Sequence, residues 1–182
     1  MFLLESLRRC RHSHGYGVQS PFGYELVTRC VRPGGYAWYG YSDIDASLGG
    51  GNFSHRIRSE ARMLLRFITM LRPHTVFLPT GINRAYQTAV RCGNSQIRIE
   101  RTASSARACD LVCSHSDFLN IEMLRDIVTI PGHWLVLKDY PSGWDDTLFE
   151  ALPEGVALVG RRNLIVINRP GMRKQRYAMA IG

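Results

Sequence analysis

The chain has 182 residues, of which 45% are hydrophobic and 21% are charged, and its formal net charge is +8. This length suits one domain, and no apolar run approaches the ~20 residues that a membrane span requires. The first ten residues lack the apolar centre of a secretion signal, so we expect a cytoplasmic protein that does not bind a membrane. The positive charge is carried almost wholly by dispersed arginines, which indicates a basic surface and leaves an acidic partner such as RNA as an alternative.

Five cysteines occur without any CxxC pair, and their odd number favours reduced thiols. Cys109, Cys113 and His115 would supply three ligands on one expected strand, whereas a structural zinc site needs four clustered ligands. We therefore expect no zinc site.

Residues 1–53 predict a helical and aromatic-rich leader. Apolar residues at 2, 3, 4 and 7 indicate a short amphipathic helix over 1–11, and Ser20 before Pro21 predicts the start of a second helix that runs from 22 to 31 and ends at the glycine-rich corner 33–35. Four aromatic residues between Tyr36 and Tyr41 form either a ligand-stacking surface or, as the favoured alternative, a seam packed on the main domain. The glycines at 49–51 predict a flexible loop. It is not expected to cradle a phosphate, because no strand precedes it and no GKS or GKT motif follows.

Residues 54–182 predict an α/β domain that forms a single compact unit with the leader. The best helical pattern covers 54–71, and Pro73 ends it. We then expect strands at 76–78, 97–99, 111–113, 134–137, 156–159, 164–167 and 177–181, and helices at 83–91, 119–128 and 144–152. The alternation predicts a mostly parallel sheet, while the short connection after 156–159 predicts antiparallel C-terminal strands.

The stretch 76–100 has the outline of a βαβ nucleotide site. Thr80 and Gly81 form a turn after the first expected strand, and Glu100 ends the second, so these three residues are the candidate cofactor-binding residues. The alternative for Glu100 is that it binds no ligand and is simply an acid at a solvent-exposed strand end. Residues 101–107 are too few for a helix and a further parallel strand, so we expect the third-strand unit to be missing.

Two polar residues end later strands and are the candidate catalytic residues. His115 has an imidazole that could act as a general base, since its unperturbed pKa is near neutrality, and an exposed loop histidine is the favoured alternative. Asp139 would lie at the carboxyl edge of the sheet, where ligands bind, and Lys138 could pair with it. Because His115 and Lys138 occupy places where a divalent metal would need carboxylates, we expect no Mg²⁺.

Four motifs in chain order resemble those of small class I S-adenosylmethionine (SAM)-dependent methyltransferases. Residues 14–22 resemble an HGVxSPF leader, 66–75 a KPKT-like corner before the first strand, 138–142 a DDI-like strand end, and 173–177 a lysine-rich C-terminal strand. The resemblance implies a Rossmann-like fold in which SAM is held by the turn after strand one, the acid ending strand two and residues after strand three. Here Phe77 stands in place of a carboxylate and Pro79 in place of a glycine, and both weaken the ligand side.

Three hypotheses follow for the function. The favoured one is a methyltransferase-fold protein with a degenerate SAM site that serves as a non-catalytic binding or scaffolding module for an acidic or small-molecule partner, as a homodimer or beside an active paralogue. The first alternative is an active SAM-dependent methyltransferase with an abbreviated pocket. The second alternative is an RNA-associated basic protein.

Overall fold

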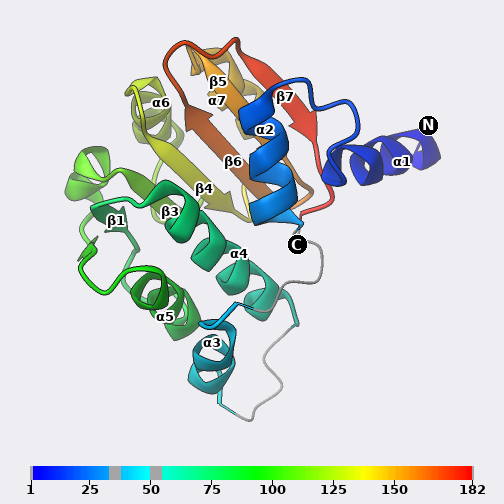
Figure 1. Cartoon of the computed structure of the whole chain (residues 1–182). Coiled ribbons are helices and arrows are strands. Elements are labelled where there is room, and N and C mark those ends of the chain that lie inside the picture. Colours follow the sequence, from blue (N-terminus) through cyan, green and yellow to red (C-terminus); the bar gives the residue numbers. More distant parts are fainter. Residues whose placement is uncertain (1, 33–37, 50–54, 182) are drawn as a thin grey trace.

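The computed structural model describes residues 2–32, 38–49 and 55–181, and these residues form a seven-stranded sheet covered by helices on both faces (Figure 1). The strands are β1 (Thr75–Phe77), β2 (Arg98–Glu100), β3 (Leu111–His115), β4 (Trp134–Lys138), β5 (Gly155–Val159), β6 (Asn163–Asn168) and β7 (Gln175–Ala178). The helices are α1 (Phe2–Ser13), α2 (Pro21–Leu26) with its π-helical continuation η1 (Val27–Val31), α3 (Tyr41–Ser47), α4 (His55–Leu71), α5 (Arg84–Gly93), the 3₁₀ helix η2 (Ala103–Ala108), α6 (Ile121–Thr129) and α7 (Trp144–Ala151).

The strand order is β2-β1-β3-β4-β6-β5-β7. All neighbouring strands are parallel except where β6 pairs, because β6 runs antiparallel to both β4 and β5. The expected α/β class with a mostly parallel sheet is therefore confirmed. β5 and β6 form the expected antiparallel pair, whereas the C-terminal strand β7 runs parallel to β5. Only η2 lies between β2 and β3, so the expected absence of a strand in this segment is confirmed as well.

Side chains alternate between two cores along the buried strands, as a sheet covered on both faces requires. In β3, Leu111 and Cys113 belong to the α4-side core, which also contains Leu64 of α4. Val112 belongs to the α6-side core, which also contains Leu124 of α6. Figure 1 shows the two layers, with α2 and α4 in front of the strands and α6 and α7 behind them.

The leader helices begin as the sequence predicts. Ser20 caps α2 by accepting a hydrogen bond from the Gly23 N–H at 3.2 Å, and Pro21 opens the helix. At the end of α1, the buried Ser13 hydroxyl accepts a hydrogen bond from the Ala180 N–H at 2.7 Å. The leader is thereby connected to the segment that follows β7.

The aromatic segment packs as a seam in part. Trp38 and Tyr41 pack against the α4-side core, and the Arg62 guanidinium lies 4.6 Å from the centroid of the Tyr41 ring. Tyr39 is instead 72% exposed. Helix α3, which begins at Tyr41, was not predicted by periodicity. The expected corner at 33–35, Tyr36 and most of the expected glycine loop lie outside the described residues.

The expected boundaries differ from the observed ones mainly at the edges of the sheet. β7 covers Gln175–Ala178, so the prediction of a strand over 177–181 was wrong at both ends. Among the described residues, no helix combines the length and the apolar character that crossing a membrane requires.

Candidate functional site

A cleft of about 410 Å³ lies at the carboxyl ends of β1, β3 and β4. Its lining includes Gly81 from the turn after β1, His115 at the end of β3 and Asp139 directly after β4. Arg56, in the first turn of α4, lines the same cleft. Ligands of open α/β sheets bind outside the carboxyl ends of the strands, so this cleft is the candidate functional site.

The structure brings three of the five predicted site residues together and leaves two apart. Gly81, His115 and Asp139 line the cleft, whereas Thr80 is exposed beside it and does not. Glu100 ends β2 opposite Phe77 of β1, so it shares the carboxyl edge with Gly81. Its carboxylate forms an ion pair with Arg98 at 2.9 Å and does not line the cleft.

Asp139 is the centre of an ion-pair cluster. Arg56 Nη2 donates a hydrogen bond to Asp139 Oδ2 at 2.6 Å, and Arg162 Nε lies 2.8 Å from Oδ1. The residue has a φ of 48°, a left-handed conformation that costs a non-glycine residue about 1 kcal/mol, and its N–H donates to the Arg162 carbonyl at 2.7 Å. The surrounding contacts therefore hold the carboxylate in one fixed orientation.

The pKa of Asp139 reflects these two guanidinium partners. Partial burial acts to raise the pKa, but the hydrogen bond from Arg56 and the charges of Arg56 and Arg162 outweigh burial and leave it below its ordinary value. The carboxylate is ionised at neutral pH, with Oδ2 accepting a hydrogen bond from Arg56 and Oδ1 in ion-pair contact with Arg162 without a hydrogen bond. It is consequently a weak base and a poor proton acceptor for catalysis.

His115 is neutral at physiological pH. Its pKa is lowered first by partial burial and then by the charge of Lys138, and nearby carboxylates oppose this shift incompletely. Nδ1 lies 3.7 Å from Asp139 Oδ2, which would favour the charged ring. Because two arginines already neutralise Asp139, burial and Lys138 decide the direction. A neutral imidazole in an open cleft is chemically able to accept a proton.

A buried polar cluster lies beneath the cleft. Glu60 of α4 and Lys138 of β4 form an ion pair with side chains that are 3% and 4% exposed. Tyr86 of α5 donates a hydrogen bond from its hydroxyl to Glu60 Oε2 at 2.6 Å and accepts one from Lys138 Nζ. Three separate elements, α4, α5 and β4, are thus joined at one point in the α4-side core.

The Glu60 carboxylate has further partners that link the two clusters. Arg56 Nε donates to Glu60 Oε1 at 2.8 Å, and Asn163 Nδ2 donates to the same oxygen at 3.3 Å. Burial acts to raise the pKa of Glu60, but Lys138, Tyr86 and Arg56 together hold it below its ordinary value. Burial and the Glu60 charge raise the pKa of Tyr86, so its phenol stays protonated and is no base.

Sequence reasoning missed this buried cluster and placed Lys138 beside Asp139 as its partner. That prediction was wrong, because the Lys138 ammonium points into the core toward Glu60, while Asp139 binds Arg56 and Arg162. One signal was present in the sequence. Glu60 precedes Leu64 by four residues on the apolar face of α4, where a single acid needs a buried cation as partner.

The thiols near β3 are buried and unreactive. Burial raises the pKa of Cys109 to about 11 and that of Cys113 to about 12, and both cysteines are free. Within ranges 2–32, 38–49 and 55–181, no three His, Cys, Asp or Glu side chains are grouped so that they could hold a metal ion.

Comparison of the chain with protein-family models, with curated proteins and with solved structures gives no match.

Proposed function

We propose that this chain is a methyltransferase-fold protein with a degenerate SAM site, which serves as a non-catalytic binding or scaffolding module. The observation that carries the proposal is that four charged residues of the cleft lining are engaged in ion pairs, namely Arg56, Glu60, Lys138 and Asp139. Asp139 pairs with Arg56 and Arg162 at the carboxyl edge, and Glu60 pairs with Lys138 beneath it. Arg56 also pairs with Glu60 and so joins the two clusters. Apart from the exposed Asp117, the charged side chains of the lining are therefore held by one another and are not free to polarise a substrate.

The strand order supports the methyltransferase part of the proposal. The sheet places β1 between β2 and β3, continues to β4, and inserts the antiparallel β6 between β4 and β5. This arrangement agrees with the Rossmann-like sheet and antiparallel finish that the sequence resemblance implies. Fold alone does not assign an activity, so the state of the cofactor edge decides the rest.

Three features of the cofactor edge support the loss of SAM binding. Phe77, where the resemblance implies a carboxylate, is 1% exposed and belongs to the α6-side core. The 3₁₀ helix η2 occupies the segment whose strand would support the adenine ring. Glu100, the candidate ribose ligand, pairs with Arg98. A site without its carboxylate and its adenine wall loses most of the contacts that position a nucleoside.

An active SAM-dependent methyltransferase is the second candidate, and one specific observation favours it. His115 is neutral, lines the open cleft and shares it with Gly81. A general base next to the turn after β1 would suit deprotonation of a methyl acceptor. Methyl transfer depends largely on positioning, however, and the cofactor edge offers few groups to position SAM.

The charge of the chain and the size of the cleft indicate which kind of partner the proposed module would bind. The basic net charge of +8 favours an acidic partner, and the cleft of about 410 Å³ is large enough for a small molecule. Assembly as a homodimer and a cytoplasmic location belong to the same proposal.

Thermal unfolding in the presence of SAM tests the proposal. A ligand at one hundred times its Kd stabilises a protein by ~2.7 kcal/mol, which for a chain of this size corresponds to a rise in Tm of roughly 5–10 °C. We expect no rise at millimolar SAM or S-adenosylhomocysteine. A rise that disappears in Glu100→Gln but persists in Glu122→Gln, an exposed acid on α6, would overturn the proposal and support the enzyme.

A further inference from the structure

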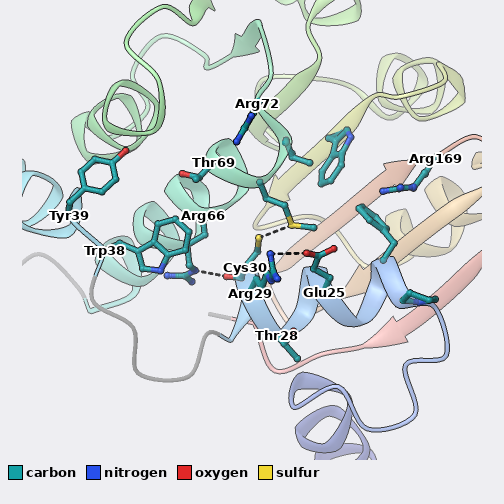
Figure 2. A pocket seen from close by; sticks show the side chains of 15 residues that line it. Glu25, Thr28, Arg29, Cys30, Trp38, Tyr39, Arg66, Thr69, Arg72 and Arg169 are labelled. Atoms are coloured by element: carbon teal, nitrogen blue, oxygen red, sulfur yellow. Dashed lines mark hydrogen bonds and ion pairs between the residues drawn. The ribbon is translucent and has the colours of Figure 1, made fainter.

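A second and larger cavity lies at the opposite edge of the sheet from the candidate site. This groove has a volume of about 1190 Å³ and is bordered by α2, by the end of α4 and by Trp134 at the start of β4 (Figure 2). Arg169, which directly follows β6, also lines it. Pockets for small molecules usually have about 300–1,000 Å³, so this groove has room for a longer ligand.

Arginines with no acidic partner border the groove. Arg72, directly after α4, and Arg169 are both exposed, and among the described residues neither guanidinium forms an ion pair. Figure 2 shows Glu25, the only acid among the described residues of the lining, engaged with Arg29, and Arg66 engaged with the Cys30 carbonyl. Two guanidiniums are therefore available to an anion.

Aromatic rings line the same groove, and the guanidinium of Arg169 lies over one of them. The Phe22 and Trp134 rings meet edge to face with centroids 5.7 Å apart, and the Arg169 guanidinium lies 4.0 Å from the centroid of Phe22. Trp38 and the 72% exposed Tyr39 line the other part of the groove. Aromatic faces and cations along one groove are the combination that holds successive bases and phosphates of a single strand.

We propose that this groove binds single-stranded nucleic acid, with Arg72 and Arg169 contacting phosphates and Trp134 and Trp38 contacting bases. The proposal goes beyond the proposed function, because it concerns the amino edge of the sheet and not the cofactor edge. Either proposal can fail while the other stands. The net charge of +8 is in accord with a polyanionic ligand.

Fluorescence anisotropy with a labelled single-stranded RNA of ten uridines tests the inference. We expect micromolar binding whose affinity falls about sevenfold between about 50 and about 200 mM salt, since two phosphate contacts give a logarithmic slope of about −1.4 for single strands. Binding should also quench tryptophan fluorescence.

Matched variants separate the groove from the general charge. Arg72→Gln combined with Arg169→Gln should abolish most of the salt dependence, whereas Arg125→Gln, an exposed arginine on α6, should not change it. Trp134→Leu should weaken binding at least about fivefold. Circular dichroism should show that each variant keeps the parent fold.

Competitors distinguish the source of the ligand chemistry. Unlabelled RNA should displace the probe at far lower phosphate concentration than uridine monophosphate or inorganic phosphate. The inference is overturned if no RNA binds, if Arg125→Gln weakens binding as much as the groove variants, or if inorganic phosphate competes as well as RNA does.

Discussion

Removing the positive partner of the buried ion pair should destabilise the protein strongly. The Glu60 side chain is 3% exposed in the parent protein. In Lys138→Met it should lose its ammonium contact and keep Arg56, Tyr86 and Asn163 as donors. Breaking a buried pair by deleting one member costs about 3–5 kcal/mol, a large share of the ~5–15 kcal/mol of a typical domain. Urea unfolding followed by tryptophan fluorescence measures this loss.

The only other lysine provides a matched control. Lys174 donates a hydrogen bond to the Glu150 carbonyl at 3.0 Å in an exposed setting, so Lys174→Met should cost at most about 1 kcal/mol. The double variant Glu60→Met/Lys138→Met should recover at least about 2 kcal/mol relative to Lys138→Met alone, since it removes the unpaired charge. The reasoning would be refuted if Lys138→Met and Lys174→Met lost the same free energy of unfolding. It would also be refuted if the loss in the double variant equalled the sum of the losses in Glu60→Met and Lys138→Met.

The pH dependence of the same variant has a defined sign. In the parent protein the pKa of Glu60 is held below its ordinary value, so its stabilisation is complete above about pH 4.3 and is lost as the pH falls through the folded pKa. In Lys138→Met, burial dominates and should raise the pKa of Glu60. The difference in the free energy of unfolding between this variant and the parent should then shrink as the pH is lowered from about 7 to about 5.

Three further substitutions, one of them with a matched glycine control, test local features of the fold. The pKa of His115 is lowered in the folded protein, so as the pH falls the histidine is protonated in the unfolded chain before it is protonated in the folded one. The free energy of unfolding of the parent should therefore decrease as the pH drops below about 6.5. This part of the pH dependence should be absent in His115→Gln. Gly155→Ala should cost more than about 3 kcal/mol in urea unfolding, because its φ is 118° and a Cβ would lie 2.0 Å from a carbonyl oxygen of β6, whereas Gly132→Ala, with open space around a φ of 80°, should cost about 1 kcal/mol. Asp110→Ala should lower the free energy of unfolding by about 1–3 kcal/mol at neutral pH, because the Asp110 carboxylate accepts hydrogen bonds from two backbone N–H groups at the start of β1, at 2.7 and 2.9 Å. The pKa of Asp110 is lowered in the folded protein, so this stabilisation should be lost at low pH. A cost that persists well below about pH 3 would contradict this role.

Local patterns were sufficient to predict most elements of the fold. The 54–71 pattern, with apolar residues at helical spacing and Pro73 after it, corresponds to α4, and Ser20 with Pro21 marks the start of α2. The short 101–107 segment correctly predicted that no strand lies between β2 and β3. These features depend on residues close in the sequence, which is why one sequence suffices to find them.

Contacts between distant segments could not be read from the sequence. The partner of Lys138 depends on how α4 and α5 pack over β4, and the nearest acid in sequence, Asp139, was the wrong choice. The seven residues of α3 bury only Ile44, so they carry no helical periodicity. The groove at the amino edge likewise joins segments around residues 22, 72, 134 and 169, which have no common motif.

The central claim is that the carboxyl edge no longer holds SAM, and a calorimetric titration of the full chain with S-adenosylhomocysteine tests it most directly. We predict no saturable heat at protein concentrations of about 100 μM or more, where even a Kd near 1 mM, about −4.1 kcal/mol, would give a measurable signal. Saturable binding with one site per chain, lost in Glu100→Gln and kept in Glu122→Gln, would contradict the account.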